Sequence, residues 1–302
     1  MLYDIALRIT YRYQQPANAG RHLLRVMPAD LPGEQQRVSG SLEVRPTGGE
    51  QSGFRDFFGN EVTRLSLTSP HDELAVVVRA RVDRTSPAPT ADTSPPWETL
   101  PTLIARELRL DGEAPHHFVK ASARVPESPL LRDFARAFVP PDVSALGAVL
   151  ALGEALHDEL IFDPDATTVD TPAEEAFVAR RGVCQDFAHI MIGCLRSVGI
   201  PAGYVSGFLR TEPPPGCPRL DGADAMHAWV RAWCGPTLGW VEYDPTNGVR
   251  VRDDHVVVAR GRDYADVAPV RGVLRTSGAQ RSIHLVDMIP LPAAGGPDQP
   301  SG

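Results

Sequence analysis

The sequence predicts an α+β protein in which a β-rich N-terminal module, sandwich or barrel-like, precedes a domain with helices packed on an antiparallel sheet. Apolar and polar residues alternate through residues 1–83, as in half-buried strands. Spacings of three and four residues then dominate between 130 and 198, and alternation returns after 202. A length of 302 residues suits two domains better than one core.

Several short strands are expected in the N-terminal module. Residues 4–13 place Ile5 and Leu7 on one face and a more polar set on the other. The other candidate strands are 36–45, 54–58, 61–67 and 74–82. Gly59-Asn60 lies between two of these and is a turn signal suited to a hairpin. Short strands joined by turns are typical of a small sandwich or barrel.

A stretch rich in Pro, Ser and Thr at 84–101 predicts a linker, and helices are expected after it. Ser128 and Asp142 are the expected N-caps of the first two helices, and Thr171 opens a capping-box pattern. The predicted helices cover 130–139, 143–160, a short segment that ends near 180–182, and 183–198.

The pattern changes again after Gly199-Ile200-Pro201, which ends the last of these helices. Strands are expected at 202–209, 225–233, 239–243 and 254–259. We assign residues 102–287 to this second domain. Residues 288–302 are rich in Pro, Gly and Ala, and we expect them to form a disordered tail.

Composition and charge argue against several classes of partner. The chain has 30 basic and 38 acidic residues, and its net charge of −8 is spread without basic clusters. We therefore expect no nucleic-acid partner and no membrane partner. The first ten residues alternate like a strand rather than forming a signal peptide. No apolar run approaches the roughly 18–20 residues of a membrane span.

The four cysteines, Cys184, Cys194, Cys217 and Cys234, lack the C-x-x-C spacing of a metal site. A disulfide framework is not expected in a long chain without an export signal. Free thiols then indicate a cytoplasmic protein. The segment 221–224 lacks the pattern of a calcium-binding loop, and we expect neither a metal nor a cofactor.

Cys184 is the candidate nucleophile. Gly182 permits a sharp approach to the helix, and Cys184 falls in its expected first turn. Unpaired amide groups and the helix dipole stabilise a thiolate there and can also face a developing oxyanion. A single cysteine is more often a small buried apolar residue, and Cys194 on the apolar helix face fits that interpretation.

A thiolate nucleophile needs a base and a group that orients the base. His227 opens one predicted strand, and Asp244 ends the next. A hairpin centred between Gly235 and Pro236 would place these two residues directly opposite each other, on the same face. An aspartate before a proline can also simply form a turn. His189 is five residues after Cys184 and should point elsewhere.

Three blocks resemble the signature blocks of the bacterial transglutaminase-like superfamily: R-G-V-C-Q-D-F-A-H at 181–189, D-A-M-H-A-W-V at 224–230 and G-W-V-E-Y-D-P-T-N at 239–247. The block D-F-F-G-N-E-V at 56–62 is similar to the β-rich N-terminal region of that branch. The resemblance implies a papain/transglutaminase-like second domain. It also implies that Cys184 is the nucleophile, His227 the base and Asp244 its orienting group.

The chain departs from the animal transglutaminases in one respect. Those enzymes carry a tryptophan before the cysteine that helps to bind the oxyanion. Trp97 is the only tryptophan before Cys184, and it lies in the predicted linker. Beyond the backbone amide of Cys184, the second oxyanion donor is therefore not assigned.

The expected reaction is hydrolysis of a peptide or amide bond in a peptide or protein substrate, through a thioester on Cys184. We favour water as the acceptor because no amine site or calcium control is recognisable, and because prokaryotic members of the resembled branch are regarded as cysteine proteases. Transfer of a glutaminyl acyl group to an amine uses the same residues and stays open. A non-catalytic binding module that keeps the fold is the second alternative.

Overall fold

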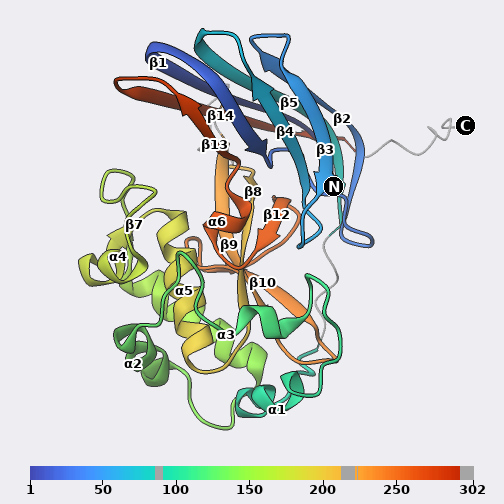
Figure 1. Cartoon of the computed structure of the whole chain (residues 1–302). Helices are drawn as coiled ribbons and strands as arrows, with labels where there is room; N and C mark the ends of the chain where they lie inside the picture. Colours follow the sequence, from blue (N-terminus) through green and yellow to red (C-terminus); the bar gives the residue numbers. More distant parts are fainter. Residues whose placement is uncertain (86–90, 212–221, 223, 293–302) are drawn as a thin grey trace, which may run out of the picture.

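The computed structural model describes residues 1–85, 91–211, 222 and 224–292. A curved antiparallel sheet forms one part, and a domain of helices around a smaller sheet forms the other (Figure 1). This architecture confirms the predicted α+β class with its β-rich N-terminal module. Parts of the predicted linker, of the segment 221–224 and of the predicted tail lie outside these residues, so the structure bears on those predictions only in part.

The first 84 residues supply five strands of the large sheet. They are β1 (Leu2–Leu24), β2 (Gln35–Arg45), β3 (Glu50–Arg55), β4 (Glu61–Leu67) and β5 (His71–Arg84). Phe57 and Phe58, which we placed in a strand, lie instead in the turn between β3 and β4. Asp56 accepts hydrogen bonds there from the backbone amides of Phe58 and Asn60, at 3.1 and 3.0 Å, and thereby closes the turn early.

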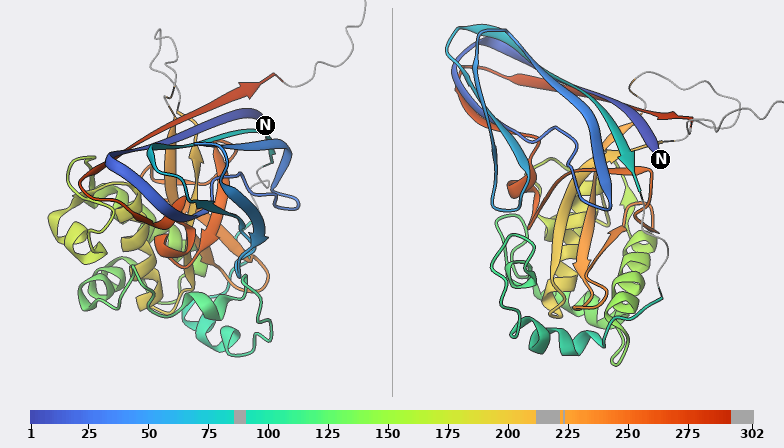
Figure 2. Two further views of the ribbon diagram at one scale, coloured as in Figure 1. Left: turned by 45° about the horizontal axis from the view of Figure 1, so that its top comes forward. Right: turned by 90° about the vertical axis from the view of Figure 1, so that its right-hand side faces the viewer.

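β1 is much longer than the predicted 4–13 because it continues through a bend. Its register shifts after Arg12 and again before Arg21, and Ala19 has a positive φ of 50°. The first half of β1 pairs with β5, whereas the second half pairs with β4. The bend curls one sheet into a half-barrel, visible from the side in Figure 2, rather than a sandwich of two sheets.

The end of the described chain returns to this sheet. β13 (Val270–Arg275) and β14 (Gln280–Leu291) both pair antiparallel with β1. The assignment of 102–287 to the second domain is therefore wrong at its C-terminal end. Met288–Leu291, placed in the disordered tail, form the last part of β14, where Met288 is fully buried. Residues 293–302 lie outside the described residues.

In the sequence, most helices lie between the strands of the large sheet and those of the smaller sheet, and one short helix follows the smaller sheet. They are the 3₁₀ turns Trp97–Thr99 and Pro115–Phe118, α1 (Leu100–Ile104), α2 (Pro129–Phe138), α3 (Ala145–Glu159), α4 (Ala173–Ala179), α5 (Cys184–Ser197) and α6 (Tyr264–Val267). The first 3₁₀ turn and the start of α1 fall inside the predicted linker, whose end is thus structured. The N-cap of α3 is Ser144, which accepts from the Gly147 amide at 3.0 Å, and not Asp142 as predicted.

The second sheet has the strand order β11–β10–β9–β8–β12. Its members are β8 (Ala202–Leu209), β9 (Ala225–Trp233), β10 (Trp240–Asp244), β11 (Val249–Arg250) and β12 (His255–Gly261). α5 packs against β8 and β9, while α2 and α4 pack on α5 (Figures 1 and 2). A short parallel pair, β6 (Ile161–Phe162) with β7 (Arg181–Gly182), leads directly into α5.

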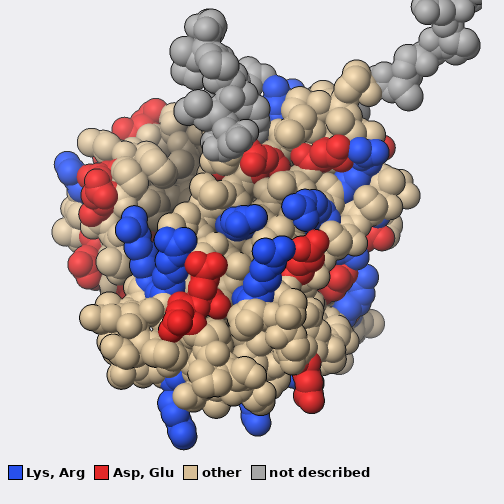
Figure 3. Space-filling view, turned by 90° about the horizontal axis from the view of Figure 1, so that it is seen from above, with Lys and Arg blue, Asp and Glu red and all other residues tan. Residues whose placement is uncertain are grey.

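One hydrophobic core extends through both parts of the molecule. It runs from Tyr3 and Ile5 on β1 to Phe187 and Ile190 on α5. On the face seen from above in Figure 3, basic and acidic side chains are interleaved rather than segregated. Among the described residues, none of the helices has the length and hydropathy that a membrane crossing would need.

Candidate active site

Cys184 is the first residue of α5 and is only partly buried. The chain reaches it through β7 and through Val183, whose backbone is extended. The carboxylate of Asp186 accepts from the Val183 amide at 2.8 Å and from the Thr167 hydroxyl at 2.6 Å. A Cβ on Gly182 would lie 2.6 Å from that carboxylate, so only glycine fits at this approach. The thiol is therefore held at the helix start.

His227 contacts both of the other predicted site residues. It lies on β9 and is buried, with 8% of its surface exposed. Its Nε2 lies 2.8 Å from Oδ2 of Asp244. The same side chain is also hydrogen-bonded to Cys184. Because Nε2 faces Asp244, Nδ1 is the ring nitrogen left for the thiol.

The electrostatics of His227 reflect these two neighbours. Burial alone would lower the pKa of His227. The hydrogen bond to Asp244, and the hydrogen bond and charge of Cys184, outweigh burial and raise the pKa to about 10. A protonated imidazole is therefore the favoured charge state of His227 at neutral pH.

Asp244 is fully buried at the end of β10, and each of its oxygens accepts several hydrogen bonds. The backbone amides of Thr246 and Asn247 donate to Oδ1 at 3.0 and 3.2 Å. The Asn247 side chain donates to Oδ2 at 2.7 Å, and Nε2 of His255 lies 3.1 Å from the same oxygen. Although burial raises the pKa of Asp244, the hydrogen bonds from His227, His255 and Asn247 hold it well below its usual range.

The hairpin that brings His227 to Asp244 has a different register from the predicted one. Trp240 pairs with Trp233 and Tyr243 with Val230, two residues away from the expected alignment. Cys234 to Gly239 form the longer connection, in which the Cys234 amide donates to the Gly239 carbonyl at 2.8 Å. A shift of two residues leaves every side chain on its original face. His227 and Asp244 are therefore diagonal neighbours rather than directly opposed, and still meet.

His255 and Asn247 are site residues that the sequence analysis missed. In the strand order, β12 is not a neighbour of β10, so strand pairing alone does not predict the contact between His255 and Asp244. No local pattern of the sequence predicts this contact either. The one available signal is the position of His255 at the start of a predicted strand, as for His227. Its Nδ1 is buried and has no partner among the described residues.

His227, Asp244 and His255 could also hold a metal ion. One ligand atom from each lies within 4.8 Å of the others, and all three residues are buried. The sequence analysis expected no metal and did not identify this cluster. The distances of 2.8 and 3.1 Å also fit a hydrogen-bonded chain that ends at Cys184, which needs no ion.

Cys194, Cys234 and His189 have other surroundings than Cys184. Cys194 and Cys234 are buried, and burial raises the pKa of the Cys234 thiol to about 12 and that of Cys194 further. Cys217 lies outside the described residues. The Nε2 of His189 accepts from the Tyr264 amide of α6 at 3.2 Å, so this ring nitrogen is already engaged. Cys194, Cys234 and His189 are therefore not assigned to the site.

The tryptophans behave as structural residues. Trp97 donates its indole N–H to the Pro140 carbonyl at 3.0 Å. Trp229 is fully buried in a small cluster with Val205 and Val257, and its N–H donates to Glu242 at 2.9 Å. Trp229 is therefore a core residue.

Comparison with protein-family models gives two matches. Residues 3–83 match the bacterial transglutaminase-like N-terminal region, and residues 132–245 match the transglutaminase-like superfamily. The first match covers most of the strands β1 to β5, and the second contains Cys184, His227 and Asp244.

Similar proteins span nearly the whole chain. An uncharacterized protein of Mycobacterium tuberculosis is 34% identical over 96% of this chain and 93% of its own. A protein of Cytophaga hutchinsonii described as a candidate cysteine protease has a solved structure with a TM-score of 0.71. It is 24% identical and covers 98% of this chain and 93% of that one. A Pseudomonas aeruginosa protein-glutamine gamma-glutamyltransferase is 38% identical, but only over 32% of this chain and 15% of its own.

Proposed function

Because the chain belongs to the transglutaminase-like superfamily, we propose that it is a cysteine-dependent hydrolase of peptide or amide bonds, with Cys184, His227 and Asp244 as its catalytic residues. One observation carries the proposal. The buried imidazole of His227 is hydrogen-bonded to Asp244 through Nε2 and also to Cys184. This is the relation among nucleophile, base and orienting group that acyl transfer requires.

The reaction begins with Cys184 as a thiolate and His227 as an imidazolium. The sulfur attacks the carbonyl carbon of the substrate, and the tetrahedral oxyanion is stabilised by the backbone N–H at the start of α5. His227 gives its proton to the departing amine as the C–N bond breaks, which leaves a thioester. His227, now neutral, takes a proton from water as the water attacks the thioester. The acid leaves, and the thiolate–imidazolium pair is restored.

Asp244 acts on this sequence through His227. Its carboxylate fixes the imidazole with Nδ1 toward the sulfur and stabilises the imidazolium. Five hydrogen bonds hold the carboxylate itself, from His227, His255, Asn247 and the amides of Thr246 and Asn247. The carboxylate therefore stays ionised and in place throughout the cycle.

Transfer to an amine is the second candidate, favoured by the likeness to the P. aeruginosa glutamyltransferase across part of the chain. It shares every step up to the thioester. A single incubation separates the two outcomes: a glutamine-containing peptide is mixed with the enzyme and a labelled primary amine. We expect free acid and ammonia, or new peptide ends, without incorporated label.

Incorporation of the label that disappears in Cys184→Ala would replace hydrolysis by transfer as the function. If the chain were a non-catalytic binding module, no peptide would yield either product. Cys184→Ala would then bind the partner of the module as well as the unmodified chain does. Peptides captured by Cys184→Ala from a digest identify the substrate class, because this variant binds without forming the thioester.

His255 is expected to act as a positioning residue for Asp244. Alanine at 255 removes one of the hydrogen bonds on Oδ2, and we expect kcat to fall about 10- to 100-fold with KM nearly unchanged. Glutamine keeps an N–H donor, so His255→Gln should recover part of the lost kcat. The measurement is kcat and KM for the same peptide with both variants.

A loss of stability alone would produce a different result. His255→Ala and His255→Gln would then show equal activity per folded molecule, with folding checked by circular dichroism and melting temperature. Equal kcat values in the two variants and the unmodified chain would remove His255 from the site. His284, an exposed histidine on β14 opposite Ile9 of β1, provides the matched control as His284→Ala.

A further inference from the structure

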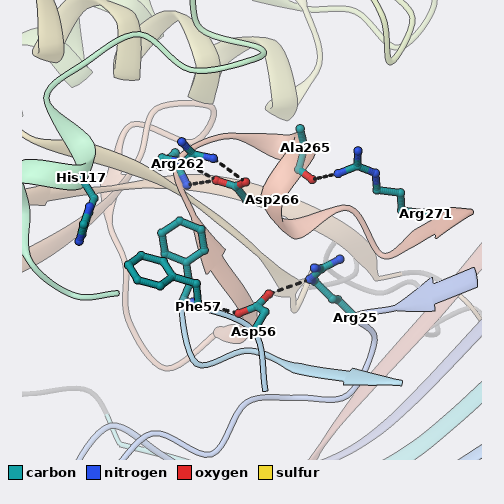
Figure 4. Close-up of a pocket in the computed structure, with 9 residues that line it drawn as sticks. Arg25, Asp56, Phe57, His117, Arg262, Ala265, Asp266 and Arg271 are labelled. Carbon is teal, nitrogen blue, oxygen red and sulfur yellow. Dashed lines mark hydrogen bonds and ion pairs between the residues drawn. The ribbon is translucent and has the colours of Figure 1, made fainter. Parts of the chain in front are cut away.

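A cavity of about 440 Å³ lies where the N-terminal sheet meets the second domain beside α6 (Figure 4). Arg25 and Phe57 reach it from the N-terminal module, and Arg262 and Asp266 reach it from the second domain. Arg271, at the start of β13, completes the wall. Neither Cys184, His227 nor Asp244 lines it, so this cavity is distinct from the candidate active site.

The cavity gathers three arginines against two aspartates, Asp56 and Asp266. The carboxylate of Asp266 is used by a single neighbour. The Arg262 amide, Nε and Nη2 donate to it at 3.1, 2.8 and 3.1 Å. Arg262 and Asp266 therefore neutralise each other.

Asp56 is equally committed. Its Oδ1 accepts from the backbone amides of Phe58 and Asn60, and its Oδ2 accepts from the Asn60 side chain at 3.2 Å and from Arg25 Nε at 3.0 Å. The pair of Arg25 and Asp56 is mostly buried, with 10% and 14% of the side chains exposed. Asp56 thus holds the turn after β3 in place, and its oxygens have little capacity left to bind a further cation.

Arg25 keeps a donor that nothing in the described residues accepts. Its Nη1 is buried and has no hydrogen-bond partner among the described residues, and only 9% of the residue is exposed to solvent. An unpartnered charged donor in a buried site is costly and is rare in folded proteins. Figure 4 shows the Arg25 guanidinium beside Asp56, on the side toward Arg271.

Arg271 is the second uncommitted cation. Its Nη1 donates to the Ala265 carbonyl at 3.2 Å, and it has no carboxylate partner in the part of the chain that the structure describes. Phe57 adds an apolar surface, since its ring is 56% exposed and meets His117 edge to face at 5.0 Å. Two arginines of the cavity therefore have donor capacity left over. They are Arg25, through Nη1, and Arg271, which has no carboxylate partner among the described residues, and both lie near the exposed ring of Phe57.

From this arrangement we propose that the cavity is a binding site for a small oxyanion, the carboxylate or phosphate group of a small molecule. Its oxygens accept from Nη1 of Arg25 and from Arg271, and an apolar portion of the molecule lies against Phe57. Arginine suits this role because its planar donors match both kinds of oxyanion. The site does not depend on the proposed reaction, so either proposal can fail alone.

The test is thermal melting of the full chain with inorganic phosphate or benzoate, against sodium chloride at equal ionic strength. A ligand at ten times its Kd should raise Tm by about 3 °C for a chain of this size. We expect at least one probe to do so, and the shift to vanish in Arg271→Gln and in Arg25→Gln. Arg12→Gln is the control, because Arg12 is exposed, pairs with Glu73 and lies outside the cavity.

The two probes distinguish the sources of the oxyanion. A larger shift with benzoate, lost in Phe57→Ala, assigns a carboxylate on an aromatic or apolar body, whereas a larger shift with phosphate assigns a phosphate compound. Arg271→Gln decides the matter if Arg25→Gln does not fold, because the Arg271 side chain is exposed. No shift above chloride with either probe, or shifts retained in Arg271→Gln, would overturn the proposal.

Discussion

Alanine in place of Cys184 is expected to abolish hydrolysis, with kcat falling at least about 10⁴-fold. The substitution removes the sulfur that forms the thioester, and no other described cysteine lies near His227. Fold and substrate binding should persist, because the thiol is partly exposed and supports none of the hydrogen bonds that hold the start of α5. The measurement is product release from a cleaved peptide at saturating substrate.

Cys194→Ala and Cys234→Ala are the matched controls. Both remove a thiol from the same domain, but these thiols are buried, and burial raises the pKa of each. They should affect stability and leave kcat per folded molecule unchanged. Iodoacetamide should inactivate the enzyme through one adduct on Cys184, with Cys217→Ser as the background chain. Activity that survives in Cys184→Ala, or inactivation that tracks another cysteine, would exclude Cys184 as the nucleophile.

The local pattern of the sequence predicts most elements well. The strands at 61–67, 202–209 and 225–233 have the expected bounds, and α5 (Cys184–Ser197) differs from 183–198 by one residue at each end. These segments alternate or repeat cleanly between strong turn signals. Their periodicity is a property of neighbouring residues, so it can be read without knowledge of the partners.

The local pattern does not show which distant segments of the chain pair with each other. The segment 14–20 contains Gln, Pro, Asn and Gly and resembles a turn, yet β1 continues through it because strands on both sides supply hydrogen bonds. For the same reason, the sequence predicts no single strand at β14, and its residues fall partly in the predicted second domain and partly in the predicted tail. Its pairing with β1 joins residues more than 260 positions apart, and no local signal encodes that distance.

The candidate site shows the same division. Cys184 was predicted as a site residue from helix-start chemistry, and both Cys184 and His227 were predicted from motif resemblance. Asp244 was predicted from motif resemblance and from a hairpin whose register differs from the observed one by two residues, a difference that keeps every side chain on its face. His255 was missed because β12 is not adjacent to β10 in the sheet, and no spacing along the chain encodes its contact with Asp244.

Asparagine in place of Asp244 is expected to lower kcat about 10⁴-fold while the fold is retained. An amide cannot stabilise the imidazolium and can hold His227 in the wrong tautomer, with its proton away from the position facing Cys184. KM should change little, because Asp244 is fully buried and does not face substrate. Asp133→Asn on the surface of α2 is the control, since its side chain is 73% exposed.

The pH dependence gives a second and more specific readout of the same change. The pKa of His227 is raised from its ordinary 6.5 to about 10, so the stabilisation that this entails is complete below about pH 6.5. That contribution is lost as the pH rises toward about 10. The free energy of unfolding should therefore fall across this window, and activity should fall with it because the departing amine needs the His227 proton.

Asp244→Asn weakens the hydrogen bond that raises the pKa of His227 most, while burial continues to lower that pKa. The alkaline limb of the activity profile should therefore move to lower pH, and unfolding free energy should vary less between about pH 6.5 and 10. Denaturant titrations at several pH values and a pH–rate profile measure both effects. An unchanged alkaline limb in Asp244→Asn would mean that Asp244 does not control the protonation of His227, and its role would then be to support the fold alone.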